Sequence, residues 1–177
     1  MKQYLDSIQI ALRTKNHFAA LSISLMMPDI CSSIEAEANK GSGALYSKWF
    51  DKYLSSYYTD KYFDTPTVYL SGKECYALRC SYLHQGIHDI GHQIILKDAL
   101  NTCNRIQFVA DDMPQDKLKM GKLTVLNLNI FCLKIIEAVE IWLNENRNNK
   151  MVNERINGMP KIETKTFSIS YDELNLD

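Results

Sequence analysis

The chain has 177 residues, the length of one ordinary domain, and a chain of this length buries roughly two thirds of its unfolded surface. Apolar residues make up 46% and charged residues 23%, with only 7 Gly and 4 Pro, which excludes disordered, collagenous and low-complexity chains. Twenty basic residues stand against 21 acidic ones, so the formal net charge is −1. Any contact with nucleic acid must therefore come from a local patch, because the chain as a whole does not attract phosphate.

The cysteines and the N-terminal segment bear on the cellular compartment. There are five cysteines, an odd number, and they never fall in a C-x-x-C pair: Cys31, Cys75, Cys80, Cys103 and Cys132. This pattern indicates neither a disulfide framework nor a thiolate zinc site. The first ten residues carry an acid and several polar side chains, and we expect no stretch to approach the roughly 18 apolar residues of a membrane span. We expect a cytoplasmic protein without a membrane partner.

Three helices are expected in the first third of the chain. Apolar residues at spacings of three and four predict a long helix over 3–27, with a break at Asn16. Pro28 is expected to end it, because proline disfavours helical geometry in the residue before it. Pro28 would then open a short helix over 28–38. A third helix over 44–58 has an aromatic face that we expect to pack on the core.

The best-bounded element lies between Ser71 and Gly86, after a stretch over 59–70 that reads as a loop. Ser71 offers a side-chain oxygen to cap a helix, and Glu74 stands three positions later, which is the pattern of a capping box. Gly86 is the expected stop. The sequence therefore predicts a helix over 71–85.

The second half changes from helical to alternating patterns. Three stretches are candidate strands of a small antiparallel sheet or ribbon: 106–110, 123–128 and 161–171. A strong helix is predicted over 129–146, and the chain becomes polar from about 148. We therefore expect one mainly α-helical domain over 1–147, followed by a C-terminal extension over 148–177 that would add a strand to the same domain.

The capped helix carries an arginine and a histidine five positions apart, Arg79 and His84, near its carboxyl end. Five residues turn the helix so that the two positions are about 140° apart, which is beyond the same-face spacing of three or four. The two side chains would converge only if the last turn loosened at Gly86, or if a second subunit supplied the other half of the site.

An arginine followed by any four residues and a histidine at the end of a core helix resembles the signature of the HEPN superfamily. Further segments give the chain a wider resemblance to a family of bacterial and phage proteins with that motif: LMMPDIC at 25–31, WFDKY at 49–53, LSG at 70–72, YALRC at 76–80 and LHQG at 83–86. The resemblance covers roughly residues 5–143. It implies a HEPN-like up-and-down helical bundle with a small β element.

The resemblance also implies an activity. HEPN proteins commonly dimerise so that two motifs line one cleft, and many are metal-independent endoribonucleases of toxin, defence or RNA-processing systems. For this chain it implies a homodimer that cleaves an RNA substrate with Arg79 and His84 as catalytic residues, needs no cofactor, and in a toxin system would have an antitoxin partner. The rival interpretation is a non-catalytic HEPN-like module that binds a protein partner or nucleic acid.

The proposed chemistry is sound on physical grounds. Metal-free RNA cleavage needs a proton acceptor for the 2′-hydroxyl, which a histidine supplies, and a cation to stabilise negative charge on the phosphorus, which Arg79 supplies with its planar fork. The sequence departs from the family in two places. Cys80 follows the arginine where active members often have a small polar residue, and Gly86 replaces the tyrosine of one toxin branch. Membership of that branch is therefore not expected.

Five residues are candidates for supporting roles: Asp29, Glu35, Cys80, Ser81 and His88. Asp29 and Glu35 could pair with Arg79 across the bundle, or could be acids that the helix dipole favours at a helix N-terminus.

Two simpler interpretations stand beside the catalytic one. Arg79 could be a surface or ion-paired arginine, and His84 a histidine that the dipole favours at a helix C-terminus. His84, His88 and His92 repeat every four residues and could hold a metal on one continuous helix, but Gly86 and Gly91 argue against that helix, so no metal is expected.

Two expectations follow for the structure. Arg79 and His84 should lie close to each other or to their symmetry mates, in an open cleft at a subunit interface. The chain should form a homodimer, because Trp49, Trp142 and ten tyrosines give more aromatic surface than one small bundle needs for its own core.

Overall fold

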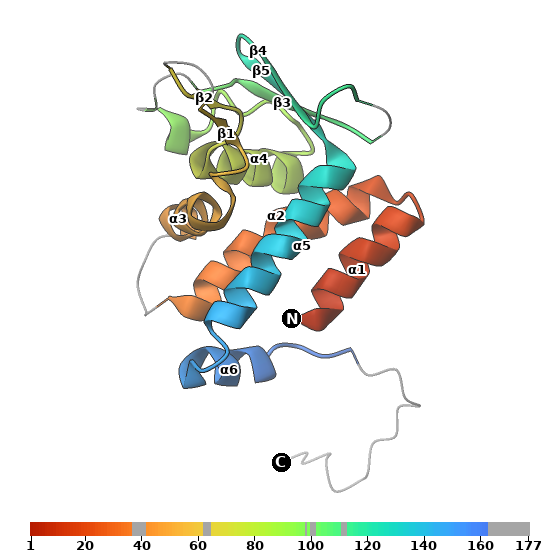
Figure 1. The fold of residues 1–177 in the computed structure, drawn as a ribbon, viewed down its shortest axis with the longest axis vertical. Coiled ribbons are helices and arrows are strands. Elements are labelled where there is room, and N and C mark those ends of the chain that lie inside the picture. Colours follow the sequence, from red (N-terminus) through yellow and green to blue (C-terminus); the bar gives the residue numbers. More distant parts are fainter. Residues whose placement is uncertain (37–41, 62–64, 98, 100–101, 111–112, 163–177) are drawn as a thin grey trace, which may run out of the picture.

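A computed structural model of the chain describes residues 1–36, 42–61, 65–97, 99, 102–110 and 113–162 (Figure 1). The protein is mainly α-helical with small sheets, as predicted. Its described helices are α1 (Lys2–Arg13), α2 (His17–Glu35), α3 (Ser42–Leu54), α4 (Gly72–Gln85), α5 (Leu128–Glu145), α6 (Lys150–Asn157) and a short 3-10 turn, η1 (Ile94–Leu96). In Figure 1, α1, α2 and α5 lie side by side, and α4 crosses the upper end of this group below the sheet.

The predicted break at Asn16 is confirmed, and the predicted end at Pro28 is wrong. The Asn16 side chain caps α2 by accepting a hydrogen bond from the Ala19 N–H at 3.2 Å. Helix α2 then runs through Pro28 to Glu35. A proline inside a helix costs one hydrogen bond and crowds the carbonyl four residues earlier. Here residues on both sides of it, among them Met27 and Cys31, are buried in the core, and this burial outweighs the local penalty.

Helix α2 is also more apolar than expected. It is the one described helix that is long and apolar enough, by length and composition, to cross a membrane, which corrects the expectation that no stretch approaches this limit. Half of its apolar window is buried inside the fold. It contacts α1, α3, α4, α5 and α6, which is the setting of a core helix in a soluble protein.

The aromatic helix is shorter than predicted. Helix α3 ends at Leu54, and the buried Tyr58 lies beyond it. Where a loop was expected, β1 (Thr59–Asp60) and β2 (Thr67–Val68) pair in antiparallel fashion.

The helix that carries the Arg-x4-His motif forms as predicted. The Ser71 hydroxyl accepts from the Glu74 N–H, and the Glu74 carboxylate accepts from the Ser71 N–H, so both halves of the capping box are present. Gly72 packs so closely on α3 that a Cβ there would overlap the Ser47 carbonyl oxygen. Gly86 ends the helix in the left-handed region, at φ +68°, which favours glycine.

The main sheet has the strand order β3-β5-β4 and mixed pairing. Strands β3 (Arg105–Val109) and β5 (Leu123–Asn127) were predicted, but they pair in parallel, so the expected antiparallel arrangement is wrong for them. The reason is β4 (Lys117–Met120), which the sequence analysis missed. It forms an antiparallel hairpin with β5, so the chain reverses direction twice between β3 and β5 and these two strands run the same way.

The start of the C-terminal extension is helical and packs on the domain. Val152 of α6 is fully buried, and Arg155 donates hydrogen bonds to the carbonyl oxygens of Ile34 and Ala36 at the end of α2, at 2.8 and 2.7 Å. Of the strand predicted over 161–171, residues 161–162 have no strand conformation and the remainder lies outside the described residues.

Buried thiols and phenols make the stability of this fold sensitive to alkaline pH. Burial raises the pKa of Cys75 and Cys103 to about 12 and that of Cys132 to about 11. It also raises the pKa of Tyr46 and Tyr58 well above the ordinary value of a tyrosine. The folded chain therefore keeps protons that the unfolded chain releases above about pH 9.

We predict that the free energy of unfolding falls as pH rises above about 9. In that range the unfolded state binds fewer protons than the folded state, and each such group removes up to about 1.4 kcal/mol per pH unit. Urea denaturation from pH 7 to 10.5 measures the effect. A flat stability curve up to pH 10.5 would contradict the prediction.

Candidate functional site

Arg79 and His84 meet within one chain. The Arg79 Nη1 atom lies 2.9 Å from the His84 Nε2 atom. Helix α4 stays α-helical to Gln85, so no loosening of the last turn is needed. The long arginine side chain closes the angular gap between the two positions, and a second subunit is not required to bring them together.

The contact also has a direction. A guanidinium offers only donors, so Nε2 of His84 is the acceptor in this hydrogen bond. A ring nitrogen that accepts a hydrogen bond is the group that a general base requires.

Arg79 is held from the other side by Asp29, as one of the two expected pairings proposed. The Nη2 atom of Arg79 lies 2.6 Å from the Oδ2 atom of Asp29, and this ion pair joins α4 to α2. The two side chains are 23% and 18% exposed, so the pair is largely shielded but still reaches the surface. Each terminal nitrogen of Arg79 uses one hydrogen in these contacts, which leaves its second hydrogen for a ligand.

The expected pairing of Glu35 with Arg79 is wrong. Its carboxylate accepts a hydrogen bond from the Trp142 indole N–H at 3.1 Å. Six residues separate Glu35 from Asp29, which places them about 120° apart around α2, so they face different neighbours.

The remaining supporting candidates have separate surroundings. The Ser81 side chain is buried, and its hydroxyl accepts from the Gln93 amide at 2.8 Å, which ties the segment after α4 back onto the helix. Cys80 is half-buried beside Arg79, whereas the other four cysteines are buried. His88 is exposed and lines a separate cavity.

The three histidines at four-residue spacing do not converge. His84 contacts Arg79, while His92 contacts Gln85 through Nε2 at 3.0 Å and lies 3.7 Å from Asp89. Within the described ranges, no group of three or more His, Cys, Asp or Glu side chains is placed to hold a metal ion.

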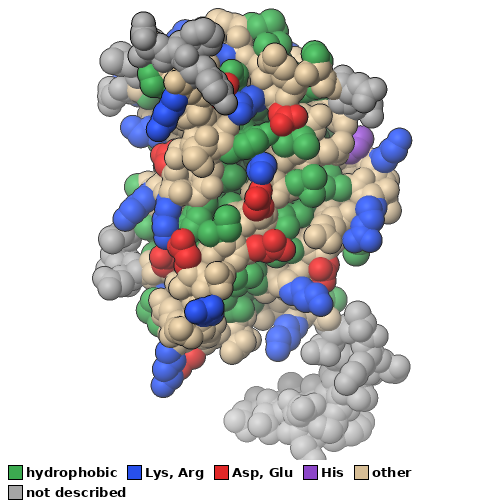
Figure 2. Space-filling view, in the orientation of Figure 1, with side chains coloured by type: hydrophobic (Ala, Val, Ile, Leu, Met, Phe, Trp, Pro, Cys, Tyr) green, Lys and Arg blue, Asp and Glu red, His purple; other side chains and the backbone are tan. Residues whose placement is uncertain are grey.

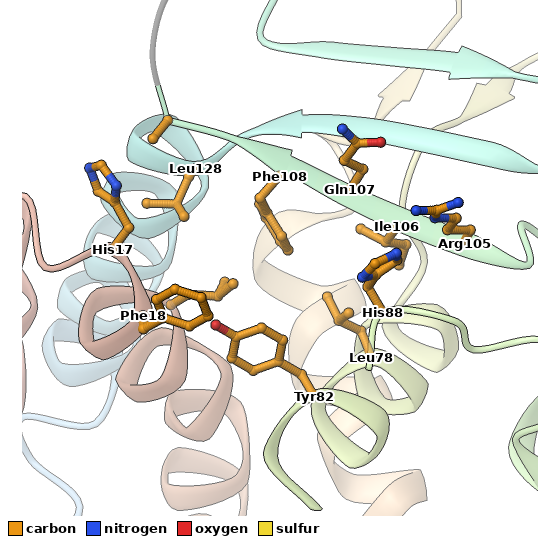
Figure 3. Close-up of a pocket in the computed structure, with 12 residues that line it drawn as sticks. His17, Phe18, Leu78, Tyr82, His88, Arg105, Ile106, Gln107, Phe108 and Leu128 are labelled. Atoms are coloured by element: carbon orange, nitrogen blue, oxygen red, sulfur yellow. The ribbon is translucent and has the colours of Figure 1, made fainter. Parts of the chain in front are cut away.

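A cavity of about 390 Å³ lies next to α4 (Figure 3), and no pattern in the sequence predicted it. Its walls come from the start of α2, the second half of α4, strand β3 and the start of α5, which are far apart in the sequence. Phe18 is 77% exposed at its mouth, and His17 also lines it. The signal in the sequence was Phe18, an aromatic residue two positions after the helix cap at Asn16. Helical periodicity alone assigns such a residue to the core.

Charge on the surface is mixed rather than concentrated. On the face shown in Figure 2, basic and acidic side chains are interspersed among apolar ones. This face has no broad basic surface, as the net charge of −1 leads one to expect. Recognition of an anion would therefore depend on individual groups such as Arg79.

Comparisons of the chain with known proteins gave no match to a protein-family model, to a curated protein or to a solved structure.

We predict that Asp29→Asn lowers the free energy of unfolding by about 1–3 kcal/mol, because it leaves the guanidinium of Arg79 without its ionic partner in a shielded position. Urea denaturation at pH 7 measures the change. Asp6→Asn, an exposed acid on α1, is the matched control and should have little effect. Equal stability of the two variants would show that the ion pair does not hold α4 to α2.

Proposed function

We propose that this protein is a metal-independent endoribonuclease of the HEPN type, in which Arg79 and His84 act on the RNA phosphodiester. The observation that carries the proposal is the 2.9 Å contact between a guanidinium and an imidazole near the end of a core helix. The Arg-x4-His motif and the mainly helical fold support the same assignment.

The contact represents the resting state of the site. While Nε2 of His84 accepts from Arg79, its lone pair is not available to a substrate. An entering phosphodiester offers oxygen acceptors to the terminal nitrogens of Arg79, which bind phosphate well. When Arg79 turns its hydrogens toward the phosphate, the imidazole is released beside the scissile group.

The released imidazole then acts as the base. Nε2 of His84 takes the proton of the 2′-hydroxyl, and the 2′-oxygen attacks phosphorus. The bond from phosphorus to the 5′-oxygen breaks, and that oxygen takes a proton from water or from the imidazolium. The products are a 2′,3′-cyclic phosphate and a 5′-hydroxyl. Arg79 stabilises the negative charge that develops on the phosphoryl oxygens.

Asp29 is a positioning residue in this scheme. It holds one end of the guanidinium at 2.6 Å and so keeps the other end directed toward His84. The Asp29 carboxylate also partly neutralises the charge of Arg79, so a phosphate must compete with Asp29 for the guanidinium.

We predict that the purified full chain cleaves RNA in EDTA and leaves DNA intact, because DNA lacks the 2′-hydroxyl. His84→Ala should lower the rate by about 10²-fold or more, the usual loss for a positioned general base, and Arg79→Ala should do likewise. Initial rates on total cellular RNA, with analysis of the product ends, measure both effects.

The controls separate this activity from a contaminant and from simple binding. His92→Ala and Arg147→Ala remove an exposed histidine and an exposed arginine outside the site and should keep the wild-type rate. If the wild type and the Arg79→Ala, His84→Ala double variant act alike on RNA, the nuclease proposal fails and a non-catalytic binding module is favoured.

The biological setting and the assembly belong to the same proposal. We propose a homodimer of a bacterial or phage defence or toxin system, with an antitoxin as a further partner in the toxin case. Trp49 and Trp142 do not support a dimer, because both side chains are buried in the core of the single chain. Support comes instead from Met26 and Ile87, which are 37% and 41% exposed and stand three positions from Asp29 and His84.

We predict that light scattering at micromolar concentration gives twice the chain mass of 20.4 kDa. Met26→Glu and Ile87→Glu should shift the mass toward the monomer, since each buries a charge in the proposed interface. Ile94→Glu, at an 88% exposed position on η1, is the control. A wild-type mass near 20.4 kDa would rule out the homodimer.

A further inference from the structure

The cavity beside α4 has an aromatic floor. The rings of Phe18 and Tyr82 lie nearly parallel, with an interplanar angle of 18° and centroids 6.4 Å apart, and Phe108 projects toward them from β3 (Figure 3). Phe18 is 77% exposed, so this floor is accessible from solvent. Flat aromatic faces of this kind bind nucleobases by stacking, with little dependence on which base is present.

The rim of the cavity is polar, and none of its twelve described lining residues is Asp or Glu. Arg105 and His88 lie near each other at one end of the cavity, and Gln107 projects from the opposite side of β3 to Phe108 (Figure 3). In the described part of the chain, the guanidinium of Arg105 makes no ion pair. The rim can therefore hold a phosphate and bond to the edge of a base.

These two features restrict the ligand. A purely apolar ligand would fill the floor but leave the guanidinium and the amide without partners. An inorganic anion would bind Arg105 but leave the rings unused. A nucleotide uses both, and a volume of about 390 Å³ lies within the range of small-molecule sites.

We propose that the cavity binds one nucleotide of single-stranded RNA, with its base stacked on Phe18 and Tyr82 and its phosphate at Arg105. Through this contact the cavity determines which position of the RNA reaches Arg79 and His84. The second statement rests on the proposed ribonuclease function, whereas the first does not.

The cavity and the Arg79 site share one helix pair. Phe18 contacts Tyr82, and Asp29 contacts Arg79, so both contacts join α2 to α4. Phe18 and Asp29 are eleven residues apart, or about three turns, and therefore lie on one stripe of α2 about 16 Å apart along its axis. A short single strand held at the cavity can follow this stripe to Arg79.

Binding of an uncleavable probe tests the cavity independently of catalysis. The probe is a fluorescent 2′-O-methyl RNA oligonucleotide of mixed sequence, titrated with the full chain in EDTA and followed by anisotropy. We expect Phe18→Ala to weaken binding about tenfold, which is the loss of one stacking contact. Arg105→Ala should also weaken binding and reduce the slope of log K against log salt by about 0.7, the value for one phosphate of a single strand.

Two control variants are matched to the cavity variants in exposure and chemistry. Ile10→Ala removes an exposed apolar side chain from α1, and Arg147→Ala removes an exposed arginine. Both should bind like the wild type. Phe18 and Arg105 are exposed, so all four variants should keep the wild-type circular dichroism and urea midpoint.

The outcomes separate the two proposals. If Phe18→Ala binds the probe as Ile10→Ala does, or if the wild type fails to bind it at tens of micromolar, the cavity proposal is overturned. If the probe binds through Phe18 and Arg105 but natural RNA is not cleaved, the nucleotide site stands and the ribonuclease proposal fails. If RNA is cleaved and the cavity variants keep the wild-type KM and cleavage pattern, the ribonuclease proposal stands and the cavity proposal fails.

Discussion

The buried carboxylate of Glu74 holds together the two elements that frame the cavity. It is 2% exposed, and a buried carboxylate is costly unless donors surround it. One oxygen accepts from the N–H and hydroxyl of Ser71, and the other accepts from the N–H of Cys103, each at 2.8 Å. The first set begins α4 and the second fixes the chain two residues before β3. One side chain thus sets α4 and β3 relative to each other, and the cavity lies between them.

The ion pair of Arg79 with Asp29 makes a different contribution. It fixes the guanidinium beside His84, but it also lowers the affinity of that guanidinium for phosphate, because a phosphate must compete with the carboxylate. Under the proposed function, such a site would hold its guanidinium in place but bind RNA more weakly in general. Contacts elsewhere on the RNA would then have to supply binding energy, and the aromatic and cationic groups of the cavity are suited to that role.

Features with a local cause were predictable from the sequence. Both ends of α4 follow from side-chain and backbone chemistry within a few residues, at Ser71 and Gly86, and the cap at Asn16 is of the same kind. The end expected at Pro28 was wrong because burial of α2 among five other helices outweighs a local preference. The strands were found, but their parallel pairing depends on β4, whose side chains alternate in exposure over only four residues.

The same distinction applies to the site. The catalytic candidates lie on one helix, so their spacing could be read from the sequence, although the angle between two backbone positions did not account for the reach of an arginine side chain. The cavity needs Phe18, Tyr82 and Arg105 from three separate elements, and no local pattern relates them. Two candidate residues on one helix can be recognised from their spacing in the sequence. A cavity whose walls come from several elements can be recognised only after the chain has folded.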